Sequence, residues 1–177
     1  MAPPKLDDAG LAAQDIQSGH VGNFVGELFT GQGQLGGMFE AIDPGFHGMP
    51  AGRHEAACAS GSIALLAATA EIEAGRYDCV LVTGVELERN VAGAVAAQHL
   101  GAATWVGEEA QWAKYAWPHM FHLVGEEYER RYGLRYEHLA RIAEINIGNA
   151  RRNPLAQTRS WAYTPESFTA DDDANPV

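Results

Sequence analysis

Apolar residues in the first half of the chain gather in two kinds of segment. Residues 78–85 form a short, nearly continuous apolar run, which is typical of a strand buried in a parallel sheet. Residues 61–74 are rich in Ala, Ile and Leu and are long enough for a helix, which Gly75 is expected to close. Shorter apolar runs predict strands at 21–25 and 54–58. Strands and helices that alternate with short links predict an α/β layer fold.

Two segments around these runs carry weaker patterns. Residues 6–16 have too few apolar positions for a helix that stands alone, and we interpret them as the end of a helix followed by a turn. A Gly-rich loop leads to a helix predicted within 32–42. Proline and glycine residues between 44 and 52 then break the chain before the next strand.

From about residue 90 the chain changes character. Residues 94–103 are mostly small and apolar, and aromatic landmarks follow at Trp105, Trp112, Tyr115 and Trp117. The pattern predicts two helices, 119–132 after Pro118 and 136–152 before Asn153-Pro154. Residues 160–177 are polar and rich in turn formers, which indicates a loop.

Charge and composition narrow the class of partner. The 177 residues are 46% apolar and 20% charged, and the formal net charge is −11. Such a charge argues against nucleic acid or an anionic membrane as a partner. No apolar run reaches the length of a membrane-spanning helix, and the N-terminus lacks the apolar region of a signal peptide. Two cysteines, Cys58 and Cys79, form no disulfide framework, so we expect a reducing, cytoplasmic compartment.

Cys58 lies where a predicted strand gives way to the Ala-rich helix. The first N–H groups of a helix have no partner within it and carry the positive end of the helix dipole. A sulfur placed there is favoured as thiolate, the nucleophilic form of cysteine. Ala59, Ser60 and Gly61 follow Cys58, and these small residues let a ligand approach the sulfur. Cys79 lies inside an apolar run and is expected to be inert core, so Cys58 is the candidate nucleophile.

A glycine pattern, Gly31-Gln-Gly33-Gln-Leu-Gly36, matches the spacing of the dinucleotide-binding fingerprint. That fingerprint needs a strand running directly into it and an acidic residue about 20 positions later, and Glu55 lies close to that distance. Residues 27–30 separate the strand from the first glycine, and Gly37 lengthens the glycine run. We therefore interpret the pattern as a loop and helix start with packing glycines.

A metal site is a second alternative, on one predicted helix. His119, His122 and Glu126 share a helix face at a spacing that could hold a metal ion. No fourth ligand lies nearby in the sequence, and the His-Glu-x-x-His arrangement does not occur. We favour a half-buried helix face and predict no metal.

Three arginines stand out in an otherwise acidic chain: Arg151, Arg152 and Arg159. Guanidinium groups bind phosphates well, so this cluster fits the phosphates of a ligand. It fits equally well as solvated cations near a helix C-terminus, where the dipole favours positive charge. Both interpretations stand at the level of the residues alone.

Specific motifs resemble a known family. The run His54-Glu-Ala-Ala-Cys58-Ala-Ser-Gly-Ser-Ile-Ala, followed by Val80-Leu-Val-Thr-Gly-Val-Glu86, resembles the N-terminal part of thiolases. Residues 121–128, 132–133, 139–143 and 149–157, with Asn153-Pro-Leu-Ala-Gln157, resemble the loop domain of that family. The resemblance is greatest to the sterol-carrier-type and actinobacterial or archaeal acetyl-CoA acetyltransferase-like branch, and it runs from about residue 6 to 177.

The resemblance implies a layered thiolase-like α/β fold in three parts. These are a partial N-terminal α/β/α core over 1–90, a mostly helical loop domain over 91–165, and a tail over 166–177 that leads toward a further strand. It also implies a homodimer, with the strand at 53–57 at a two-fold interface. In the family a central strand precedes the first residues present here. We therefore expect an internal piece or a truncated product, a sheet with unpaired edges, and a complementary C-terminal half as a partner.

The resemblance also implies acyl transfer on CoA thioesters, and hence a role in lipid metabolism. Cys58 matches the cysteine that attacks the thioester carbonyl and holds the acyl group, with acyl-CoA as substrate and no separate cofactor. Loop-domain helices contribute to the CoA site in the family, which favours Arg151 and Arg152 as phosphate contacts. The family's activating histidine, second cysteine and Asn/His motif are not matched in this sequence. We therefore expect little or no thiolysis from the isolated chain.

Two alternatives remain beside the acyltransferase. One is a non-catalytic, thiolase-like scaffold that binds a partner chain or an acyl-CoA without turnover. The other is a thiolase-fold aldolase that cleaves CoA esters, a chemistry that does not require an acyl-cysteine. The presence of Cys58 favours the acyltransferase over the aldolase.

Overall fold

Two compact units make up the chain. The computed structural model describes residues 6–171, and the units span Met1–Ala103 and Thr104–Val177. In the described residues, no helix combines the length and the apolar character needed to cross a membrane.

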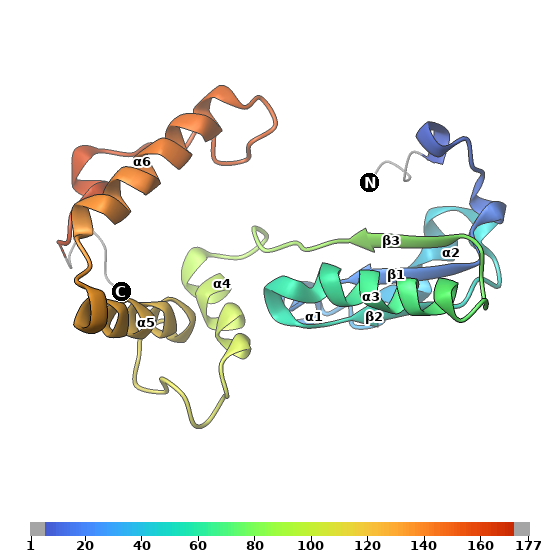
Figure 1. The fold of residues 1–177 in the computed structure, drawn as a ribbon, viewed down its shortest axis with the longest axis horizontal. Helices are drawn as coiled ribbons and strands as arrows, with labels where there is room; N and C mark the ends of the chain where they lie inside the picture. The colour runs from blue at the N-terminus through green and yellow to red at the C-terminus, as the bar shows by residue number, and fades with distance from the viewer. Residues whose placement is uncertain (1–5, 172–177) are drawn as a thin grey trace. The chain divides into compact units, whose positions relative to one another are not determined.

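A parallel three-stranded sheet forms the centre of the first unit (Figure 1). Its strands are β1 (Ser18–Gly22), β2 (Ala51–His54) and β3 (Val80–Gly84), in the order β2-β1-β3. The ladder of β1 with β3 runs without interruption from Ser18↔Val80 to Gly22↔Gly84. The expected parallel α/β sheet is confirmed. Within the described residues β1 is the central strand and is bonded on both sides, and the further family strand stays a prediction.

One face of the sheet packs against helix α3 (Ser60–Glu73), which runs along the strands in Figure 1. Ala64 and Ala68 of this helix are buried. The predicted C-terminal signal is confirmed, since Gly75 adopts a φ of 65°. Its N–H donates to the Ile72 carbonyl at 2.9 Å, and the Arg76 N–H donates to the Glu71 carbonyl at 3.0 Å. This paired arrangement requires the left-handed conformation that glycine adopts without strain.

The opposite face of the sheet carries the apolar core. Its buried members are Ala13, Ile16, Val21, Phe39 and Phe46, and half-buried Leu81 and Met49 pack against them. Side chains alternate between the faces of a strand, so Val21 points to this core while its neighbours His20 and Gly22 point to α3. Thus the apolar core lies on one face of the sheet, while β1 presents polar and small residues to the other face.

Short elements connect the strands of the first unit. They are α1 (Gly26–Thr30), α2 (Phe39–Ile42) and α4 (Gly93–Leu100), with 3-10 turns at Leu6–Ala9, Ala13–Asp15, Leu35–Met38, Pro44–Phe46, Ala57–Ala59 and Gly101–Ala103. The helix predicted within 32–42 corresponds to a 3-10 turn followed by α2. Residues 6–16 form two 3-10 turns in place of the predicted helix end. Neither α1 nor α4 was expected from the sequence pattern.

Two strand predictions were displaced along the chain. The first strand ends at Gly22 instead of residue 25, and β2 covers Ala51–His54 instead of 54–58. The segment after His54 turns because side chains capture its backbone. Glu55 accepts the Ala57 N–H at 2.6 Å, and the Ser60 hydroxyl accepts the Ala56 N–H at 3.0 Å. These N–H groups are therefore not available for a strand ladder.

The second unit contains two long helices. They are α5 (Ala116–Tyr132) and α6 (Tyr136–Arg152), which confirm both helices predicted for this region. A 3-10 turn at Pro165–Phe168 follows, and the Tyr136 hydroxyl donates to the Thr169 carbonyl at 2.6 Å. The assignment of 91–165 to a loop domain stays a prediction. Residues 172–177, half of the predicted tail, lie outside the described residues.

Candidate active site

The turn that carries Cys58 follows the carboxyl end of β2. In open parallel sheets the carboxyl ends of the strands form the edge at which ligands bind. A single 3-10 turn, Ala57–Ala59, connects β2 to α3 there. Cys58 is a free, exposed cysteine in the middle of this turn. The predicted strand–turn–helix setting of the candidate nucleophile therefore exists, although its strand ends earlier than expected.

Local hydrogen bonds hold the Cys58 turn in a strained shape. Ala57 has a φ of 48°, a left-handed conformation that residues with a Cβ rarely adopt. The Ser60 hydroxyl accepts the Ala56 N–H at 3.0 Å and donates to the Ala57 carbonyl at 2.6 Å. The Glu55 carboxylate accepts the Ala57 N–H at 2.6 Å. These three bonds fix the backbone immediately before Cys58.

Close backbone packing sets the start of α3 against the central strand. A Cβ placed on Gly22 of β1 would lie 2.8 Å from both the Cα and the N of Gly61. Real Cβ atoms do not approach backbone atoms this closely, so only glycine fits at position 22. The first turn of α3 consequently lies directly on the end of β1. The helix begins two residues after Cys58, and the N–H groups of Ala59 and Ser60 are bonded to the Ala56 and Ala57 carbonyls.

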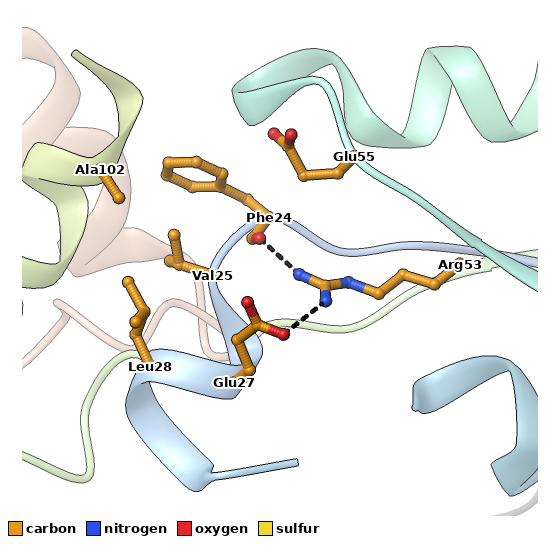
Figure 2. A pocket seen from close by; sticks show the side chains of 7 residues that line it. All are labelled: Phe24, Val25, Glu27, Leu28, Arg53, Glu55 and Ala102. Atoms are coloured by element: carbon orange, nitrogen blue, oxygen red, sulfur yellow. Dashed lines mark hydrogen bonds and ion pairs between the residues drawn. The ribbon is translucent and has the colours of Figure 1, made fainter. Parts of the chain in front are cut away.

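A pocket of roughly 460 Å³ opens at the same edge of the sheet (Figure 2). Its lining residues are Phe24, Val25, Glu27, Leu28, Arg53, Glu55 and Ala102. The Arg53 guanidinium donates to the Phe24 carbonyl at 2.7 Å and to the Glu27 carboxylate at 3.1 Å. Its Nε is buried and has no hydrogen-bond partner. Because Glu55 also holds the Ala57 N–H, the pocket wall and the Cys58 turn share a side chain.

Glu86, just after β3, holds the loop that forms the apolar wall of this pocket. Its carboxylate accepts the N–H groups of Phe24 at 2.8 Å and Val25 at 3.2 Å, and the Asn23 amide at 3.1 Å. Asn23 is buried and also donates to the Val85 carbonyl at 2.6 Å. Partial burial, together with the nearby Glu86 charge, raises the pKa of Glu88. The Glu86 carboxylate, which sequence reasoning did not single out, therefore anchors this loop.

A chain of three titratable side chains lies beneath α3. The His20 Nδ1 is 2.7 Å from the His54 Nε2, and the His20 Nε2 is 2.9 Å from a Glu71 carboxylate oxygen. The hydrogen bond from His20 lowers the pKa of Glu71, with a smaller contribution from Ser18. Burial lowers the pKa of His54, and the charge of His20 acts in the same direction while that of Glu71 opposes it. Sequence reasoning missed these residues, although His20 immediately precedes the predicted strand 21–25 and His54 begins the predicted strand 54–58.

The predicted phosphate contacts belong to the second unit. Arg151 and Arg152 are exposed in the last turn of α6, in the second unit, where Arg152 donates to the Asn149 side chain at 2.5 Å. Their role at CoA phosphates stays a prediction. Cys79 is half-buried and packs against the apolar core.

The two alternatives to this site have little structural support. Gly31 ends helix α1 with a φ of 74°, so no strand runs into the glycine pattern of 31–36. The His122 Nε2 lies 3.3 Å from a Glu126 carboxylate oxygen. The His119 ring packs edge-on against the Trp112 ring, with 4.4 Å between the ring centroids. Within the described residues, no three His, Cys, Asp or Glu side chains form a group that could hold a metal ion.

Comparison with known proteins gives consistent matches. The family model described as thiolase, N-terminal domain, matches residues 3–159. An acetyl-CoA acetyltransferase of Methanocaldococcus jannaschii is 35% identical over 152 residues, which cover 86% of this chain and 38% of that protein. An acetyl-CoA acetyltransferase of Methanothermobacter thermautotrophicus is 32% identical over 152 residues, covering 86% and 39%. Sterol carrier protein 2 of Bos taurus is 29% identical over 173 residues, covering 93% and 31%. The chain thus spans under two fifths of the length of these relatives.

Proposed function

The chain belongs to the thiolase family, whose N-terminal domain it matches over residues 3–159, and we propose that it is the nucleophile-bearing part of an acyl-CoA acyltransferase. The observation that carries the proposal is the position of Cys58. It is an exposed cysteine in a strained turn, at the carboxyl end of a parallel strand and the start of a 14-residue helix. Two relatives at 32–35% identity are named acetyl-CoA acetyltransferase, which supports acetyl-CoA as a substrate.

The proposed step is transfer of an acyl group from CoA to Cys58. The Cys58 thiolate attacks the thioester carbonyl carbon, and the carbonyl oxygen becomes an oxyanion that nearby backbone N–H groups can stabilise. The carbon–sulfur bond to CoA then breaks, and the CoA thiolate takes up the proton that Cys58 lost. The products are S-acyl-Cys58 and free CoA. In the whole protein this acyl-cysteine serves either thiolytic cleavage or Claisen condensation.

Arg151 and Arg152 are proposed to contact CoA phosphates. Both are exposed and lie near each other at the end of α6, where cations are also favoured by the helix dipole. Replacing both by Gln should weaken CoA binding by about tenfold and reduce its dependence on salt. Arg141→Gln on the same helix is the matched control, because Arg141 is already paired with Glu144 at 2.9 Å. Equal CoA affinities for these variants would contradict the assignment.

Mass spectrometry of the acylated chain tests the main proposal. The 177-residue chain is incubated with acetyl-CoA, and peptides are mapped for an added acetyl group. We expect acetylation of Cys58, its loss in Cys58→Ser and its retention in Cys79→Ser. Acetylation of both cysteines to the same extent, or of neither, would refute the nucleophile assignment.

A second candidate is a non-catalytic, acyl-CoA-binding or scaffold role. Its support is the similarity to proteins named sterol carrier protein 2. Size-exclusion chromatography with light scattering, with and without CoA and a candidate C-terminal thiolase half, separates the two. A homodimer or complex that binds CoA without acylating Cys58 would favour the scaffold.

A further inference from the structure

The contact between α3 and the sheet is unusual in having no large apolar side chain at its centre. Ser60, Ala64 and Ala68, at helical spacing, face the sheet and are buried. On the sheet side, Gly22 contacts the helix backbone directly. Small residues let a helix approach closely, but they do not interlock. They therefore resist sliding of the helix along its axis less than large side chains do.

Glu71 lies on the same face of the helix, and its carboxylate makes a directional hydrogen bond to the sheet. It follows Ala68 by three positions and lies on the stripe that faces β1. Its carboxylate is bonded to His20 of β1, and His20 is bonded to His54 of β2. The His20 side chain is only 8% exposed and that of Glu71 only 24% exposed. These hydrogen bonds thus connect α3 to both β1 and β2.

With both histidines uncharged and Glu71 ionised, the donors and acceptors of this hydrogen-bond chain fit one arrangement. An ionised carboxylate only accepts, so the His20 Nε2 carries a proton and donates to Glu71. The His20 Nδ1 is then an acceptor, and the His54 Nε2–H donates to it. The lowered pKa values favour an ionised Glu71 and an uncharged His54 at neutral pH. The remaining neighbours are the Ser18 hydroxyl of β1 and the Arg76 guanidinium after α3, while β3 presents Val80 and Val82 to this face.

We propose that Glu71, His20 and His54 are positioning residues that set the axial position of α3 and thereby the shape of the Cys58 turn. His54 ends the strand that leads into the turn, and Glu71 lies on the helix that leads out of it. Both arms of the turn are therefore tied to one side chain of the central strand. The inference rests on the proposed role of Cys58 as nucleophile. It assigns the three residues no contact with substrate.

The rate at which iodoacetamide alkylates Cys58 reports the conformation of the turn, and this measurement requires no CoA. In a Cys79→Ser background, His54→Leu should slow alkylation at pH 8 by about tenfold, because His20 loses its buried donor. His54→Gln should stay within about twofold of the unsubstituted chain, since a glutamine amide can still donate to the His20 Nδ1. His47→Leu is the matched control. This substitution breaks a histidine–glutamate hydrogen bond of 2.7 Å between two exposed side chains. Equal rates for His54→Leu and the unsubstituted chain would overturn the proposal.

Imidazole NMR of the unsubstituted chain keeps the proposal testable if His54→Leu does not fold. We expect the His54 ring to be the Nε2–H tautomer at pH 8. We also expect Glu71→Gln to lower, by about one pH unit, the pH at which the histidine pair takes up its first proton. The proposed hydrogen-bond chain would be refuted if the two histidines titrate independently and Glu71→Gln does not change their titration. Because neither readout uses acyl-CoA, failed acetylation of Cys58 would refute the proposed function and leave this test intact.

Discussion

Cys58 and Cys79 are the same residue type in two chemical environments. Cys58 is exposed in the turn before α3, and Cys79 is half-buried against the apolar core. The greater exposure of Cys58 favours reaction at that residue. We expect iodoacetamide to label Cys58 at least about tenfold faster than Cys79 under native conditions. Peptide mapping over a time course measures the two rates, and urea-unfolded chain is the control in which they should converge. Equal native rates would contradict the assignment.

The shifted pKa values of His54 and Glu71 predict how stability depends on pH. The pKa of His54 is lowered from 6.5, so the unfolded chain takes up this proton first as the pH falls. The stability contributed by His54 is therefore complete above pH 6.5 and decreases below it. The pKa of Glu71 is lowered from 4.5, so its contribution is lost below that value. Both effects have the same sign.

Urea unfolding as a function of pH checks this prediction. The raised pKa of Glu88 acts with the opposite sign near pH 4.5 and above, so a Glu88→Gln background removes it. In that background the unfolding free energy should fall between about pH 7 and pH 5, and His54→Gln should flatten this fall. A free energy of unfolding that rises on acidification in this window would show that the sign is wrong.

At the scale of elements, the α3–β1 contact depends on Gly22. Gly22→Ala would place a Cβ 2.8 Å from the backbone of Gly61, which cannot move without displacing the start of α3. We expect a loss of about 1–3 kcal/mol in the free energy of unfolding. Gly61→Ala is the matched control, because a Cβ there meets nothing within 4 Å and alanine favours the helix. Urea unfolding followed by circular dichroism measures both. A Gly22→Ala chain as stable as Gly61→Ala would contradict the close contact.

Which elements the sequence predicts follows from how local their signal is. Helices α3 and α6 and strand β3 have long or continuous apolar patterns, and all three were predicted. Strand β2 has four residues, one of them Gly52, and its pattern placed it three residues too late. Helix α1 has five residues and was missed. Short elements are set by tertiary contacts that a local pattern does not contain.

The site divides in the same way. The Cys58 turn could be predicted because strand, turn and helix are adjacent in sequence. The Glu86–Phe24 bond joins residues 62 apart, and the His20–Glu71 bond joins residues 51 apart. A polar residue on an apolar stripe indicates that a partner exists, but its identity depends on the fold. Glu71, on the helical stripe of Ala64 and Ala68, was such an indication.

At the scale of the whole molecule, the proposed chemistry is distributed over two units. Cys58 and the pocket belong to the first unit, and Arg151 and Arg152 belong to the second. The chain matches 38–39% of the length of two relatives named acetyl-CoA acetyltransferase. Acyl transfer to a thiolate needs no removal of an α-proton, whereas making or breaking the carbon–carbon bond involves a carbanion at the α-carbon. The first step therefore requires fewer catalytic groups than the complete reaction.

We expect the 177-residue chain to carry out this first step without sustained turnover. Incubation with acetoacetyl-CoA should give acylated Cys58 in at most one equivalent, with no continuing loss of acetoacetyl-CoA when free CoA is added. The reason is that motifs matching the family's activating histidine and α-proton cysteine do not occur in these residues. Absorbance of the acetoacetyl-CoA enolate follows turnover, intact mass follows acylation, and Cys58→Ser is the control for both. Continuous cleavage above the Cys58→Ser rate would show that this chain supplies its own base, and His20 and His54 would then be the first residues to replace.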